Sequence, residues 1–203
     1  MTGQDMLKRV LPRMAKHQDG SGVSFIDSLN TAIGLIAGRL WERRSELVKA
    51  TMELDADTDP FPLPSDFRGI AEDPFLVSAT GNTSGLTPLP TGTLADYYGK
   101  TGVPKHYRLY GNKIQVFPAP NADYLVTGEY FAHPKDVVLT SAIPWFGLFD
   151  KVIEDAVVRI AVAGDATAVL ADAGFREEMA QEVDSVLSSR TNPAPRRSTA
   201  RFL

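Results

Sequence analysis

The stretch 106–130 constrains the fold most, because its local pattern permits one backbone geometry. Two runs rich in β-forming residues, 107–110 and 113–117, flank the dipeptide Gly111-Asn112. Each run alternates in character with the two-residue period of a strand, and Gly-Asn is typical of a two-residue hairpin turn, which requires positive φ. The sequence therefore predicts an antiparallel hairpin with a defined register.

A third strand is predicted after this hairpin. Pro118 and Pro120 lack the backbone N–H that a strand ladder needs, so the chain must turn before the run 124–130. We expect this run to return beside the hairpin, which gives a three-stranded antiparallel meander.

Periodic apolar residues predict two helices before this β region. The first covers 2–14, where Thr2 and Asp5 have the spacing of a capping box, and Pro12 is expected to kink it or end it near Leu11. The second begins near residue 24, and its apolar stripe runs to about residue 47 through Ile26, Leu29, Ile33, Ile36, Leu40 and Leu47.

Two features of the second helix leave alternatives open. Its charged side is interpreted as a solvated face, with a DNA-facing or partner-facing side as the alternative. Gly34 and Gly38 lie four residues apart, a spacing that lets another helix approach closely but is weak evidence in a soluble helix.

The region 51–104 is different in character. Its seven prolines and its glycines forbid long regular elements, which indicates extended chain, short edge strands and loops. Within it, the polar, glycine-bearing segment 79–92 is interpreted as a projecting loop that orders on contact with a partner.

Helices return after the β region. Pro144 can serve as the first residue of a helix over 145–163, and Gly164 can break it. A last helix is predicted over 175–187. Beyond it, the tail has two interpretations, a disordered segment or an arm that wraps an acidic neighbour or, as a weaker alternative, DNA; its arginines and terminal apolar pair are Arg190, Arg196, Arg197, Arg201, Phe202 and Leu203.

These patterns predict an α+β protein, namely an α-helical bundle with an inserted antiparallel β-meander or small sheet and an extended C-terminal tail. Residues 1–50 and 144–188 supply the helices, 51–143 the loop-rich β region, and 189–203 the tail. A chain of 203 residues with 43% hydrophobic and 23% charged residues is ordinary for a globular protein with its own core.

Composition excludes several classes. The net charge of −4 argues against a generic nucleic-acid coat, and the absence of cysteine excludes disulfides and thiolate metal sites. The longest uncharged apolar stretch is interrupted by Pro144 and is shorter than the ~20 residues of a membrane span, so we expect no membrane partner.

No catalytic constellation is visible in the sequence. The three histidines, His17, His106 and His133, lack zinc-ligand spacing, and no phosphate-binding loop or nucleophile elbow occurs. The loop acids Asp55 and Asp57 could act in acid–base catalysis, but nothing in the sequence distinguishes them from other carboxylates in loops. We expect no enzyme activity, no cofactor and no metal.

Several motifs together resemble the head-to-tail adaptor (connector) proteins of tailed bacteriophages. They are a Leu-Pro-x-Asp-Phe turn at 63–67, a Tyr-x-Leu-x-Gly hairpin at 107–111, a Pro-x-Pro at 118–120, a short Asn/Asp loop, and a strand bearing Tyr124 and Tyr130. Their order between N-terminal and C-terminal helices extends the resemblance over nearly the whole chain.

The resemblance implies a homo-oligomeric ring of twelve copies in the virion neck, made in the host cytoplasm and docked beneath the portal protein. Double-stranded DNA would pass through the lumen without specific binding. The C-terminal residues Arg190, Arg196, Arg197, Arg201, Phe202 and Leu203 would contact the portal. The β region would meet a tail tube, nozzle or tail-terminator protein through Tyr107, Tyr110, Asn112 and Asn121.

Two alternatives remain at this point. A carbohydrate-binding or other adhesion module of a virion would use aromatic platforms such as Trp145, Tyr97, Tyr98 and Tyr107. A small hydrolase would use the loop acids Asp55 and Asp57.

Overall fold

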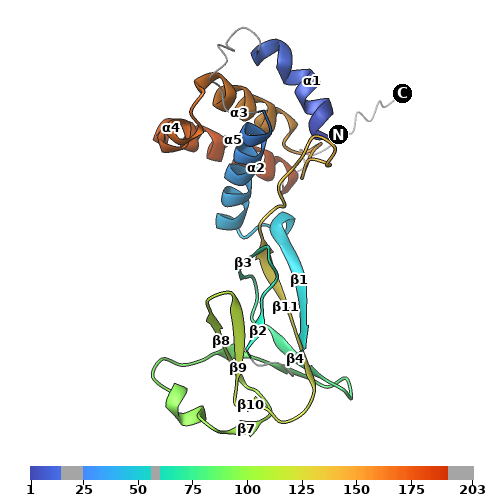
Figure 1. The fold of residues 1–203 in the computed structure, drawn as a ribbon, viewed down its shortest axis with the longest axis vertical. Helices are drawn as coiled ribbons and strands as arrows, with labels where there is room; N and C mark the ends of the chain where they lie inside the picture. The colour runs from blue at the N-terminus through green and yellow to red at the C-terminus, as the bar shows by residue number, and fades with distance from the viewer. Residues whose placement is uncertain (15–24, 56–59, 192–203) are drawn as a thin grey trace, which may run out of the picture. The chain divides into compact units, whose positions relative to one another are not determined.

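The computed structural model of the chain describes residues 1–14, 25–55 and 60–191. The chain divides into two compact units, one formed by Met1–Arg43 and Pro134–Leu203, the other by Arg44–His133. We call them the helical unit and the β unit (Figure 1). The predicted α+β class, with a β region inserted between helical segments, is confirmed.

The helical unit buries one face of each long helix in a common core. Its helices are α1 Gly3–Met14, α2 Phe25–Glu42, α3 Asp150–Ala163, α4 Ala166–Ala171 and α5 Ala173–Thr191. α2 packs against both α3 and α5, and α1 packs mainly against α3. The core residues include Met6, Val10, Leu29, Ile33, Ile36, Leu40, Ile153, Val157, Ile160, Phe175, Met179 and Val183.

The first helix starts as predicted but does not end at Pro12. The Thr2 amide donates to the Asp5 carboxylate (3.0 Å), and the Asp5 amide donates to the Thr2 hydroxyl (3.3 Å), which is the reciprocal pattern of a capping box. α1 continues through Pro12 to Met14. Pro12 has no amide hydrogen to donate to the carbonyl four residues earlier, so the helix continues with one hydrogen bond fewer at this position.

Two other predicted helix ends are wrong. α2 ends at Glu42, not near Leu47, because Arg44 adopts φ +50° and Ser45 caps a separate 3₁₀ turn, η1 Glu46–Val48. α3 begins at Asp150, not at 145, because Trp145 (φ +54°) and Gly147 (φ +94°) both have positive φ, which an α-helix does not allow.

The last helix is longer than predicted at both ends. The side chain of Asp172 accepts hydrogen bonds from the amides of Gly174 (2.9 Å) and Phe175 (3.3 Å), so α5 begins at Ala173. It extends to Thr191, and Arg190 is therefore helical rather than part of an extended tail.

The β unit contains three small sheets among its described residues. A five-stranded sheet has the order β1-β11-β4-β5, with β3 also paired to β11; a four-stranded sheet has the order β2-β9-β8-β6; β10 pairs with β7. The strands are β1 Lys49–Asp55, β2 Phe61–Pro62, β3 Phe67–Ile70, β4 Phe75–Ser78, β5 Thr83–Gly85, β6 Thr87–Pro88, β7 Thr101–Gly102, β8 His106–Tyr110, β9 Lys113–Phe117, β10 Ala119–Pro120 and β11 Tyr124–Ala132, and a 3₁₀ turn, η2, covers Leu94–Tyr97.

The predicted hairpin is confirmed, with Tyr110 opposite Lys113 across a two-residue turn. Gly111 alone has positive φ (+58°), as in a type II′ turn, so the positive φ is needed at only one of the two turn residues. The predicted three-stranded meander is wrong. β11 is the central strand of the other sheet, because the free edge of β9 is taken by β2, with Phe61 opposite Ile114.

The segment 79–92 is not a projecting loop. It supplies β5, which pairs with β4, and β6, which pairs with β8. Between them Leu86 is 1% exposed and lies in a core shared by the two larger sheets, together with Phe61, Leu76, Tyr107, Ile114, Val116 and Val126. Burial of Leu86 therefore holds this polar segment in place.

Candidate assembly surfaces

Two tyrosines of the motifs found in the sequence are structural anchors of the β unit. The hydroxyl of Tyr130 donates to Asp66 (2.8 Å), and its ring stacks on Phe67 at 5.6 Å between centroids. The backbone amide of His133 donates to the Asp66 carbonyl oxygen (2.7 Å). The Leu-Pro-x-Asp-Phe turn thus ties the start of β3 to the end of β11. Burial and this hydrogen bond raise the pKa of Tyr130 to about 12.

Tyr107 makes an equivalent bond in the other sheet. Its hydroxyl donates to Asp73 (2.8 Å), its side chain is 6% exposed, and burial is the main reason that its pKa is raised. Tyr107 was expected to contact the tail, but its side chain belongs to the core and offers no contact surface.

The other expected tail-contact residues are exposed but are not brought together. Tyr110 is 61% exposed, and Asn112 follows it in the hairpin turn. Asn121 is also exposed and accepts a hydrogen bond from the Tyr124 hydroxyl (3.1 Å). The hairpin turn precedes β9, whereas Asn121 comes after β9 and directly follows β10, so the two sites lie beyond opposite ends of β9.

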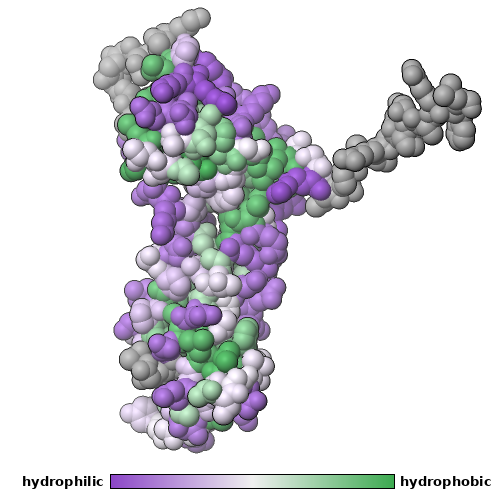
Figure 2. All heavy atoms as spheres, turned by 90° about the vertical axis from the view of Figure 1, so that its right-hand side faces the viewer, coloured by the Kyte–Doolittle hydropathy of each residue, from purple (hydrophilic) through white to green (hydrophobic). Residues whose placement is uncertain are grey.

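A groove of about 400 Å³ lies at the surface of the β unit. We call it the tyrosine groove; its lining residues include Leu94, Tyr97, Tyr98, Lys100, Arg108 and Phe117. Figure 2 shows hydrophobic residues reaching the surface of this unit among hydrophilic ones. The side chain of Tyr98 is 92% exposed and that of Leu94 42%, so both offer apolar area to a partner.

Arg108 is held in a fixed orientation in this groove. Its Nε and Nη2 donate to the Gln115 side-chain oxygen at 2.9 and 2.7 Å. Its guanidinium carbon lies 5.4 Å from the ring centroids of both Tyr110 and Phe117, within cation–π range. The sequence analysis singled out Tyr97 and Tyr98 but missed Arg108 and Phe117. The hairpin register was the available signal, because it places Arg108 opposite Gln115.

A second groove, of about 200 Å³, lies on the helical unit between α2 and α5. Gly34 and Gly38 both line it, and a Cβ added at either position would meet no atom within 4 Å. The two glycines therefore border open space and do not accommodate a helix of the same chain. The other lining residues are Leu35, Ile36, Arg39, Glu42, Arg176, Met179, Ala180 and Val183.

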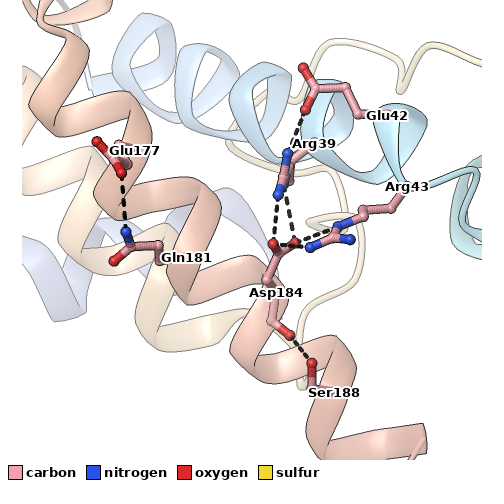
Figure 3. A network of polar contacts seen from close by, with 7 residues as sticks. All are labelled: Arg39, Glu42, Arg43, Glu177, Gln181, Asp184 and Ser188. Carbon is pink, nitrogen blue, oxygen red and sulfur yellow. Dashed lines mark hydrogen bonds and ion pairs between the residues drawn. The ribbon is translucent and has the colours of Figure 1, made fainter.

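A carboxylate held by two arginines closes one end of this helix pair (Figure 3). Arg39 donates to Asp184 through Nε (3.1 Å) and Nη2 (2.6 Å), and Arg43 donates to the same carboxylate through Nε (3.0 Å) and Nη2. These hydrogen bonds hold the pKa of Asp184 well below its usual range. Because Asp184 is on α5 and Arg39 on α2, the network fixes the two walls of the groove.

The expected portal-contact residues are only partly described. Arg190 lies exposed in the last turn of α5. The remaining five, Arg196, Arg197, Arg201, Phe202 and Leu203, lie outside the described residues.

Other kinds of site find little support in the described part of the chain. No group of three or more His, Asp or Glu residues there could hold a metal ion, and no helix there is long and apolar enough to cross a membrane. Asp55 ends β1, whereas Asp57 lies outside the described residues.

Comparison with known proteins agrees with the resemblance found in the sequence. The family model described as SU10 adaptor protein matches residues 1–200, which include both units. No curated protein matches the chain. The family consists of structural phage proteins and is not typically enzymatic. The chain therefore belongs to the SU10 adaptor protein family of phage head-to-tail adaptors.

Proposed function

We propose that the protein forms a closed ring between the portal and the tail of a phage particle, and that the ring seals this junction around a channel for DNA. The observation that carries the proposal is the family match over residues 1–200, since it covers the helical and the β unit together. The ring would contain as many copies as the portal, which is twelve if the family resemblance holds for copy number. Each copy would contribute a modest interface, and closure of the ring would add avidity.

The groove between α2 and α5 is the proposed contact between neighbouring copies. A ring of identical chains uses two different faces per copy, so the groove must receive another face of the next copy. Gly34 and Gly38 leave space for close approach of a helix, and the half-buried Leu35 and Ala180 of the lining supply apolar area to bury. Exposed apolar side chains of the same unit, such as Leu11 and Val162, are candidates for the facing surface.

The two ends of the ring would meet different neighbours. Arg190 and the terminal residues 192–203 are proposed to contact the portal, because their arginines lack a compensating acid in the adjacent sequence. The exposed residues Tyr110, Asn112 and Asn121 are proposed to contact a tail component. The net charge of −4 supports passage of DNA without adhesion, since nonspecific DNA binding depends on clustered cations.

Substitutions at Gly34 test the ring. Gly34→Leu would place a bulky side chain in the groove and is expected to abolish oligomers and the complex with portal in native mass spectrometry. Gly34→Ala is the matched control, because it fills little of the space and is expected to leave assembly intact. Normal assembly of Gly34→Leu would show that the groove is not the ring interface.

A further inference from the structure

We propose that the tyrosine groove docks an extended, acidic segment of a tail protein that carries a large apolar side chain. This inference rests on the proposed function and names the chemistry of one partner. The groove volume of about 400 Å³ is larger than one aromatic side chain, so an apolar anchor and part of its backbone fit inside.

The exposed apolar side chains of the groove are typical of a binding surface. Tyr98, 92% exposed, loses little conformational freedom when a partner packs on it, because its ring has two rotatable bonds. Leu94, 42% exposed, lies on the preceding turn η2, and Tyr97 of the same turn packs on Phe117 of β9 with 6.0 Å between the ring centroids. Aromatic residues that a partner covers contribute a large share of the binding energy of an interface.

The charge of the lining selects an acidic partner. Lys100 and Arg108 line the groove, and no carboxylate is among its lining residues. Asp96 is exposed on η2 but is not part of the lining. Arg108 is already oriented by Gln115, so a carboxylate that reaches it would pair with a guanidinium that loses little side-chain entropy.

The backbone around the groove favours an extended segment. Among the described strands, β7 and β10 pair only with each other, and Thr101 of β7 and Ala119 of β10 both line the groove. Each strand of a two-stranded ladder keeps an open edge, and an extended peptide can add to such an edge through its main chain.

A protein segment fits this groove better than nucleic acid or sugar does. Single-stranded DNA needs a row of cations along its backbone, whereas this lining has two on a chain of net charge −4. Sugars need several polar side chains around an aromatic platform, whereas the surface of this groove is mostly apolar.

Fluorescence polarisation of the full chain with short overlapping synthetic peptides tests the proposal. The peptides cover the tail proteins of the same virus, and the expected binder combines acidic residues with a large apolar one. Tyr98→Ser is expected to weaken its binding at least tenfold, and Lys100→Glu to weaken it likewise, whereas Lys105→Glu, which makes the same charge change outside the lining, leaves binding unchanged. Lysine in place of the peptide's acids abolishes binding.

Four results would overturn the proposal. The first two are that no peptide binds, or that Tyr98→Ser leaves peptide binding unchanged. The third is that the groove binds oligothymidylate or glycans and no peptide. The fourth is that sedimentation experiments show self-association that Tyr98→Ser abolishes, since a second copy of the chain would then cover Tyr98. Thermal melts of Tyr98→Ser should match those of the native chain, since the side chain is 92% exposed. Ring formation is measured separately, so a ring without peptide binding contradicts only this inference, and peptide binding without a ring contradicts the proposed function.

Discussion

Replacing Asp184 by asparagine removes the charge that joins α5 to α2 and leaves the size of the side chain unchanged. The carboxylate accepts two hydrogen bonds from Arg39 and two from Arg43, and its side chain is 22% exposed. Hydrogen bonds to charged groups contribute about 1.5–3 kcal/mol, and partial exposure reduces this, so we expect Asp184→Asn to lower the free energy of unfolding by about 2 kcal/mol. For a chain of this size Tm falls by about 4–8 °C.

The pH dependence gives the prediction a sign. The pKa of Asp184 in the folded protein lies well below its ordinary value of 3.8. The stability from its charge is therefore fully present above that ordinary value and is lost as pH falls toward the folded pKa. Urea denaturation of both proteins should give a constant difference between about pH 5 and 8, and the difference should shrink below about pH 4.

Glu177→Gln is the matched control for this experiment. Glu177 is exposed on the same helix and accepts one long hydrogen bond from Gln181 (3.4 Å), so its loss should change the free energy of unfolding by less than about 0.5 kcal/mol. A loss at Asp184 no larger than that of the control, or a difference that persists unchanged in acid, would refute the reasoning.

Five further substitutions, at four positions, probe the fold. Tyr130→Phe removes the hydrogen bond to Asp66 and should cost about 1–2 kcal/mol in urea denaturation, and a neutral result would show that the bond adds nothing. Gly38→Ala should increase the free energy of unfolding by about 0.5–1 kcal/mol, and so raise Tm, because the added Cβ meets no atom within 4 Å. Gly3→Ala should lower Tm, because its Cβ would lie 2.9 Å from a carbonyl oxygen. Gly111→Val should cost about 1–3 kcal/mol because φ is +58°, and Gly111→Asn less, as chemical denaturation of both variants would check.

The parts of the fold that could be predicted are those fixed by neighbouring residues. The hairpin around Gly111 was predictable because its turn and its alternation lie within a dozen residues. The capping box of Thr2 and Asp5 is also local. The pairing of β11 with β1 was not predictable in this way, because it joins residues far apart in the chain, such as Lys49 and Phe131.

The wrongly predicted helix ends and the wrongly predicted exposure of Tyr107 both depend largely on features that the local sequence pattern does not show. The end of α2 and the start of α3 depend on positive φ at Arg44 and Trp145, residue types that give no signal, and at Gly147, where the glycine was a signal that the prediction did not use. Tyr107 alternates as a strand residue does, but only the buried core shows that its hydroxyl turns toward Asp73. The adaptor resemblance, in contrast, depended on the order of short motifs and is confirmed by the family match.

The most direct test of the proposed ring is quantitative mass spectrometry of purified phage particles, with the copy number of this protein compared with that of the portal. One copy of the protein per copy of portal is the expected result, since a ring of matching symmetry must contain as many chains as the portal it closes. Absence from particles, or a copy number unrelated to that of the portal, would contradict the proposal.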